Sequence, residues 1–196
     1  MDYKMTIAGL ERSLPLCKVT DDLYIAGFIM FNDVEITKAV AAELLAMAPE
    51  FDVLITAESK GIPLCYEMAR QSGKPYIVAR KGAKVYMQDV VTVKVNSITT
   101  KGEQILCLGR DERDVMNGKR ILIADDVIST GESIAALEQL VESVGGIIVG
   151  KFAVLAEGEA ADRDDITYLE YLPLFDPSGV PLHSNEDRAT NPHLDK

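Results

Sequence analysis

Two adjacent carboxylates, Asp125 and Asp126, follow an apolar run and lead into a turn of small hydroxyl residues. The stretch 121–133 reads ILIADDVISTGES, so Gly131 stands just before an expected helix. A loop entering a helix N-terminus offers free backbone N–H groups to a phosphate, and a glycine lets the backbone come close. Carboxylates at the carboxyl end of a parallel strand lie where open α/β sheets bind ligands, and they accept hydrogen bonds from sugar hydroxyls. The stretch therefore predicts a ligand with a phosphate and a sugar.

A plainer interpretation of this stretch stays open on spacing alone. Ser129 or Thr130 can simply cap the helix that follows, because helix starts of this kind are common. The two carboxylates are then a solvated strand end. The choice depends on whether other segments supply groups for the same ligand.

A second turn with a cation lies at residues 56–63, between an apolar strand and a helix. Lys60 precedes Gly61 in this turn, which makes it another place where an anion can bind. The plainer interpretation is a surface lysine in an ordinary connection.

A third segment, after the strand expected at 76–79, carries Arg80, Lys81 and Lys84. Three basic residues within five positions stand out in a chain whose formal net charge is −11. A solvated basic face is the alternative to an anion site here.

Apolar runs alternate along the chain with apolar residues at helical spacing. This alternation predicts strands at 23–30, 53–55, 76–79, 121–124 and 147–155, and helices at 34–47, 63–71 and 132–144. Strands that are apolar throughout are typical of a parallel sheet with helices on both faces. We therefore predict an α/β fold with a parallel sheet flanked by helices.

The pattern changes between residues 81 and 118. Runs at 90–95 and 103–108, joined through 99–102, predict a hairpin inserted in the α/β core. Such an excursion is either a lid over the site or an edge hairpin without a role in catalysis. From Asp176 onward the composition turns polar, which predicts a C-terminal tail.

Composition narrows the class of protein. The 196 residues, 47% hydrophobic and 26% charged, suffice for one core of ordinary size. No apolar run approaches the roughly 20 residues that span a bilayer, and the start lacks a secretion signal, so we expect a cytoplasmic protein without a membrane partner. The net charge of −11 disfavours nucleic acid. Three widely spaced cysteines without nearby histidines disfavour structural zinc and a disulfide framework.

The stretch 121–133 resembles the 5-phosphoribosyl 1-pyrophosphate (PRPP) motif of type I phosphoribosyltransferases, an apolar strand followed by Asp-Asp-apolar-x-x-Thr-Gly-x-Ser/Thr. The resemblance implies that Asp125 and Asp126 hold the ribose 2′- and 3′-hydroxyls and are catalytic residues together with Lys60. It also implies that the 5′-phosphate is bound by Ile128, Ser129, Thr130, Gly131, Glu132 and Ser133.

The two cationic segments resemble other parts of the same family. Residues 56–63 resemble its pyrophosphate loop, so Glu58, Ser59, Lys60 and Gly61 are expected at the diphosphate, with a cis or strongly distorted peptide between Ser59 and Lys60. The run Arg80-Lys81-x-x-Lys84 resembles the one by which dimeric members supply cations to the neighbouring subunit's diphosphate. The resemblance therefore implies a homodimer with shared sites.

The resemblance covers about residues 23–155 and is strongest toward adenine and xanthine phosphoribosyltransferases and the effector domain of the bacterial purine repressor. It implies the type I phosphoribosyltransferase fold over residues 1–175, with an N-terminal hood at 1–33 and a flexible hairpin at about 82–110, followed by a tail at 176–196. Ser129 stands where hypoxanthine-guanine enzymes have an aspartate base, which argues against that subgroup. Ser59-Lys60-Gly61 stands where adenine enzymes usually have Ala-Arg-Gly.

The implied reaction displaces diphosphate from carbon-1 of PRPP by a ring nitrogen of a purine, with adenine favoured over xanthine. Positioned cations and N–H groups suit the negative charge that grows on the diphosphate. Mg²⁺ is the expected cofactor, held by PRPP and water without direct protein ligands. The base is expected at Phe28, Phe31 and Asn32, although Phe28 equally fits the core.

Two other classes of function stay open. A non-catalytic PRPP sensor uses the same loops. A phosphate-binding hydrolase is disfavoured, because the chain has no Walker-type Gly-x-x-x-x-Gly-Lys-Ser/Thr.

Overall fold

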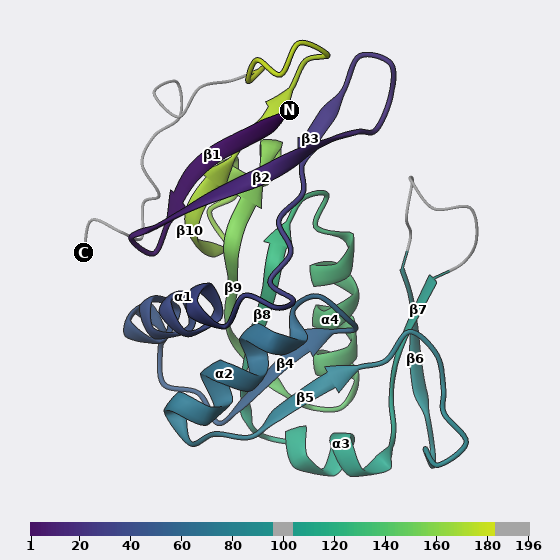
Figure 1. The fold of residues 1–196 in the computed structure, drawn as a ribbon. Helices are drawn as coiled ribbons and strands as arrows, with labels where there is room; N and C mark the ends of the chain where they lie inside the picture. Colours follow the sequence, from purple (N-terminus) through teal and green to yellow (C-terminus); the bar gives the residue numbers. More distant parts are fainter. Residues whose placement is uncertain (96–103, 183–196) are drawn as a thin grey trace.

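The computed structural model describes residues 1–95 and 104–182. Its centre is a five-stranded sheet with strand order β10-β9-β8-β4-β5, in which every neighbouring pair is parallel (Figure 1). The strands are β4 (Val53–Ala57), β5 (Tyr76–Ala79), β8 (Arg120–Ile128), β9 (Ile147–Glu157) and β10 (Thr167–Leu172). The predicted α/β fold with a parallel sheet is confirmed.

Helices cover both faces of this sheet. Helices α1 (Val34–Met47) and α2 (Ile62–Ser72) pack on one face, and α4 (Glu132–Ser143) packs on the other. Strand β8 shows the consequence: Leu122 and Ala124 belong to the core on the α1 and α2 side, whereas Ile121 and Ile123 belong to the core on the α4 side. Because both faces are buried, the strand is apolar throughout rather than alternating.

A second sheet packs over the α1 side of the molecule. Its strands, in the order β1-β2-β3-β11, are β1 (Asp2–Ile7), β2 (Leu10–Lys18), β3 (Tyr24–Ala26) and β11 (Leu174–Phe175). The region expected as a hood therefore takes its fourth strand from near the other end of the chain, and Phe175 is fully buried. Along β1 exposed polar side chains alternate with more buried ones, so the sequence shows no continuous apolar run there.

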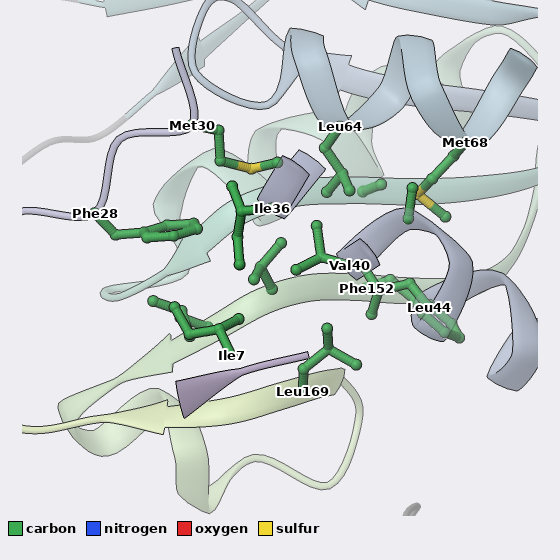
Figure 2. Packing of buried hydrophobic residues seen from close by; sticks show 14 of the residues in the cluster. Ile7, Phe28, Met30, Ile36, Val40, Leu44, Leu64, Met68, Phe152 and Leu169 are labelled. Carbon is green, nitrogen blue, oxygen red and sulfur yellow. The ribbon is translucent and has the colours of Figure 1, made fainter. Parts of the chain in front are cut away.

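The strand expected at 23–30 is wrong beyond Ala26. After that residue the chain leaves the sheet, and Phe28 and Met30 are buried without belonging to a strand (Figure 2). Both side chains belong to the same core as Ile36 of α1. An apolar run in a sequence indicates that its residues are buried. Here the burial comes from packing on α1 and not from strand pairing.

The inserted segment contains the antiparallel strands β6 (Val91–Val95) and β7 (Gln104–Leu108), as predicted. Their expected connection at 99–102 lies outside the described residues. The N–H of Arg80 donates to the carbonyl of Cys107 at 3.0 Å, and the N–H of Cys107 donates to the carbonyl of Arg80 at 2.9 Å. These two hydrogen bonds join β7 to the end of β5. The helix α3 (Arg110–Met116) follows and was not predicted. The hairpin therefore stands beside the basic run that starts at Arg80.

The short helix η1 (Gly158–Asp162) connects β9 to β10. The first part of the expected tail folds back, because the N–H of Leu182 donates to the carbonyl of Leu174 at 2.8 Å. Residues 183–196 lie outside the described part of the chain. None of the helices in residues 1–95 and 104–182 is long and apolar enough to cross a bilayer.

Candidate active site

A cleft of about 220 Å³ opens where β4 and β8 end at the same edge of the sheet. Parallel strands bring their carboxyl ends together, so segments far apart in sequence meet here. Leu106 of β7 forms part of the wall. The predicted site residues that line this cleft are Glu58, Ser59, Lys60, Lys81, Asp125, Asp126 and Ser133.

The ammonium group of Lys60 lies 3.0 Å from Oδ2 of Asp126. The carboxylate is 3% exposed, whereas the lysine side chain is 51% exposed. A buried carboxylate needs a compensating charge, and Lys60 provides it here. Strand β8 runs on to Ile128, so the prediction that it ends at Ala124 is wrong, and both carboxylates belong to the strand.

Asp125 lies directly beneath the loop that contains Gly61. Its Oδ1 accepts the N–H of Asp126 at 2.9 Å. Burial, followed by the charge of Asp126, raises the pKa of Asp125 well above its ordinary value. A Cβ on Gly61 would lie 2.2 Å from the Thr56 hydroxyl oxygen and 2.7 Å from Asp125 Oδ1. The close approach of this loop to β8 therefore requires glycine.

Glu58 ties the predicted pyrophosphate loop to the basic run. Its carboxylate accepts the N–H of Lys81 at 2.9 Å, and the guanidinium of Arg80 lies 3.4 Å away. The backbone hydrogen bond from Lys81, more than the charge of Arg80, lowers the pKa of Glu58. The cis peptide bond in this loop joins Glu58 to Ser59, so the prediction of Ser59–Lys60 is wrong by one residue.

The predicted phosphate loop forms a smaller hollow of about 110 Å³ beside the cleft, lined by residues 127–134 and Asp125. Ser129 and Thr130 are exposed, whereas the side chain of Ile128 is buried, so only its backbone faces the hollow. Gly131 has φ +79° where α4 begins. This left-handed conformation favours glycine, and Glu132 and Ser133 form the first turn of the helix.

The remaining predicted residues lie outside these two hollows. Lys84 is exposed and does not line the cleft of its own chain. Phe31 and Asn32 line a separate pocket of about 350 Å³ between α1 and α2. Phe28 is 5% exposed and packs in the core (Figure 2). The structure therefore does not bring the three together around one hollow, and their assignment to the base stays a prediction.

Sequence reasoning missed Glu157, the last residue of β9. Ile128 pairs with Ala156 in the sheet, so the next residues, Ser129 and Glu157, lie side by side at its carboxyl edge. The carboxylate is 9% exposed and accepts a hydrogen bond from the Ser129 hydroxyl. Burial raises its pKa, against the opposing effects of Ser129 and of the Lys60 charge. The signal in the sequence was an acid directly after the apolar run at 152–156.

Comparisons with known proteins agree with this arrangement. The family model described as phosphoribosyl transferase domain matches residues 34–181. The chain is 36% identical over 128 residues to the adenine phosphoribosyltransferase of Cenarchaeum symbiosum, which covers 64% of this chain and 72% of the relative. It is 30% identical over 192 residues to the purine biosynthesis transcriptional repressor of Bacillus subtilis, which covers 95% of this chain and 62% of the repressor.

A third relative is the xanthine phosphoribosyltransferase of an Exiguobacterium strain, which is 32% identical over 118 residues. The alignment covers 60% of this chain and 60% of that enzyme. The chain thus spans about three fifths of the length of this enzyme and of the repressor.

Solved structures share the fold. The adenine phosphoribosyltransferase of Saccharomyces cerevisiae superposes with a TM-score of 0.65 at 18% identity, covering 80% of this chain and 92% of that one. The adenine phosphoribosyltransferase of Rhodothermus marinus gives 0.64 at 22% identity, covering 80% and 94%. With the family model matching most of its length, the chain belongs to the phosphoribosyltransferase family.

Proposed function

We propose that this protein is a purine phosphoribosyltransferase, which transfers the 5-phosphoribosyl group of PRPP to a purine base, with adenine favoured, and releases diphosphate. The observation that carries the proposal is the cleft in which Lys60, Asp125 and Asp126 meet. Two motifs expected for different parts of PRPP thus line one hollow. The phosphate loop forms the adjoining hollow, which supports the proposal that it binds the 5′-phosphate.

In this reaction the bond between carbon-1 and the diphosphate oxygen breaks, and a bond from a purine nitrogen to carbon-1 forms. Asp125 and Asp126 accept hydrogen bonds from the two ribose hydroxyls and hold the sugar. Lys60, Lys81 and the backbone N–H groups of the loop at 58–61 stabilise the charge that grows on the departing diphosphate. The proton of the attacking purine nitrogen goes to the departing diphosphate or to water.

The site residues fit a magnesium ion that arrives with the substrate. Within residues 1–95 and 104–182 no group of three or more His, Cys, Asp or Glu side chains is placed to hold a metal ion. The two carboxylates are oxygen acceptors of the kind to which metal-bound water donates. When bound, Mg²⁺ neutralises part of the charge on the diphosphate.

Ser129 supports adenine as the favoured base. Its side chain carries no acid group to take a proton from an oxopurine. The test is PRPP-dependent nucleotide formation with adenine, xanthine, hypoxanthine and guanine. The release of diphosphate measures the rate with each base. Turnover of adenine above the other three supports the proposal, and turnover of xanthine alone would make the protein a xanthine enzyme.

A second candidate is a regulatory domain that binds PRPP without turning it over. The match to a purine repressor over 95% of this chain favours it. Tight binding of PRPP by calorimetry, with no turnover of any of the four bases, would select this function over the enzyme.

We further propose a homodimer. Arg80 and Lys81 contact Glu58 of their own chain, but Lys84 is exposed outside the cleft. Its position suits a contact with the diphosphate of a neighbouring subunit.

A further inference from the structure

Arg163 lies against the phosphate loop although it comes from another part of the chain. It follows η1, on the connection between β9 and β10. A Cβ built on Gly131 would lie 2.3 Å from one terminal nitrogen of the guanidinium, Nη1. The arginine therefore sits directly on the turn where α4 begins, against Gly131, which lines the smaller hollow.

The guanidinium is held in one orientation from its other side. Its Nε and Nη2 both donate to the carboxylate of Asp165, at 2.8 Å each. Lys151 pairs with the same carboxylate and with Glu138 of α4. None of the hydrogen bonds of Arg163 within the described part of the chain uses Nη1. Two donor hydrogens on a fixed, planar cation thus point toward the loop.

The loop beside this nitrogen favours an anion. The start of α4 carries the positive end of the helix dipole, which repels a neighbouring cation. The loop at 128–133 contains no cation of its own, and its one charged side chain, Glu132, is negative. A phosphate monoester carries a charge of about −1.5 to −2 at neutral pH. Such a group bound at the loop, beside Nη1, turns a repulsion into two attractions.

We propose that Arg163 is a phosphate-binding residue, which donates from Nη1 to the 5′-phosphate of PRPP and of the nucleotide product. Asp165 is the positioning residue that holds its guanidinium. This inference rests on the proposed function for the identity of the ligand. It adds to the phosphate loop a cation that lies outside the motif, so the loop's own residues do not carry the binding of a doubly charged group alone.

The test is calorimetric titration of the full chain with ribose 5-phosphate and, separately, with diphosphate. Arg163→Gln keeps the polar shape and leaves Asp165 paired with Lys151. Arg70→Gln is the matched control, because Arg70 makes a similar two-nitrogen pair with Glu67 on α2. We expect Arg163→Gln to weaken ribose 5-phosphate about tenfold to a hundredfold, the loss of one charged hydrogen bond. Diphosphate affinity should stay within about twofold in both variants, and Arg70→Gln should bind both ligands as the unmodified chain does.

Melting curves separate binding from a merely structural role. If Arg163 binds phosphate, the ligand-free melting temperature stays near that of the unmodified chain, while the rise caused by ribose 5-phosphate shrinks. Unchanged affinity for ribose 5-phosphate overturns the inference, and so does an equal loss of affinity for both ligands. The titration needs no turnover. A chain that transfers no base but binds ribose 5-phosphate through Arg163 refutes the proposed reaction and leaves this inference standing.

Discussion

Lys60 and Asp126 form an ion pair across the cleft, with 3.0 Å between the ammonium nitrogen and Oδ2. One partner lies in the loop after β4 and the other near the end of β8, so the pair joins two motifs. Its carboxylate is almost fully buried, and it lies next to Asp125, whose pKa is raised by burial and by this same neighbour. The site thus holds two close carboxylates, of which Asp126 is paired with Lys60.

Replacing both carboxylates, Asp125→Asn with Asp126→Asn, should weaken the use of PRPP while the fold is retained. Each lost charged hydrogen bond to a ribose hydroxyl should cost about 1.5–3 kcal/mol of binding in the ground or transition state. The change also removes the repulsion between two neighbouring charges, so the melting temperature should not fall. Steady-state kinetics with varied PRPP, together with thermal melting, check both statements. Wild-type kinetics in the double variant would contradict the sugar-binding role.

Gly61→Ala should lower both activity and stability. The added methyl group would meet the Thr56 hydroxyl and the Asp125 carboxylate at distances that real Cβ atoms do not tolerate. Overpacking of this kind typically costs about 1–3 kcal/mol. Gly27→Ala is the matched control, because its new methyl group would make only ordinary contacts, the shortest 3.5 Å to the carbonyl oxygen of Pro15. Chemical denaturation and initial rates measure the two effects, and equal behaviour of the two variants would show that the close approach is unnecessary.

The central strands β4 and β8 were predictable because they are buried on both faces. Continuous apolar runs such as 121–124 therefore marked the places of these strands, although not their ends. The same signal failed at Phe28, which is buried by packing on α1 outside any strand. It also failed for β1, where alternating exposure leaves few apolar residues in a row.

The cleft residues were predictable because each follows or ends a parallel strand, and parallel strands end at one edge. Glu157 and Arg163 were not predictable. Strand register places Glu157, and the folded connection between β9 and β10 places Arg163. Glu157 lies beside Ser129 because β9 pairs with β8, and Arg163 returns to Gly131 through η1. Only the three-dimensional arrangement shows either contact.

Glu157→Gln should raise stability relative to the unmodified chain as the pH increases. Burial raises the pKa of Glu157 in the folded state above its ordinary value of 4.5. A carboxyl group shifted in this direction contributes stability below its unfolded pKa, and the contribution is lost as the pH rises through the folded pKa. Glutamine does not titrate. The difference in melting temperature, variant minus unmodified, should therefore grow from about pH 4.5 upward and then level off.

Glu159→Gln, at an exposed position on η1, is the control for this series. Thermal melts of both variants across the same buffers measure the difference. A Glu157→Gln chain whose relative stability falls with increasing pH would mean that the hydrogen bond from Ser129 and the charge of Lys60 outweigh burial.

Lys84→Ala should abolish most activity, although Lys84 is exposed and lies outside the cleft of its own chain. If Lys84 serves the diphosphate of a neighbouring subunit, the defect can be repaired in mixed dimers. A chain with Asp125→Asn and Asp126→Asn supplies an intact Lys84, and a Lys84→Ala chain supplies intact carboxylates. After subunit exchange, each hybrid dimer holds one complete site and one site with both defects.

Random exchange of equal amounts makes half of the dimers hybrid, so about a quarter of all sites should become active, as two-fold symmetry requires. The control mixes the carboxylate variant with a chain that carries all three substitutions, in which no arrangement completes a site. Native mass spectrometry verifies that hybrids form, and initial rates before and after exchange measure the recovery. Hybrid dimers without recovered activity would place Lys84 at its own chain's diphosphate and would end the proposal of shared sites, because each site of a hybrid would then keep one of the two defects.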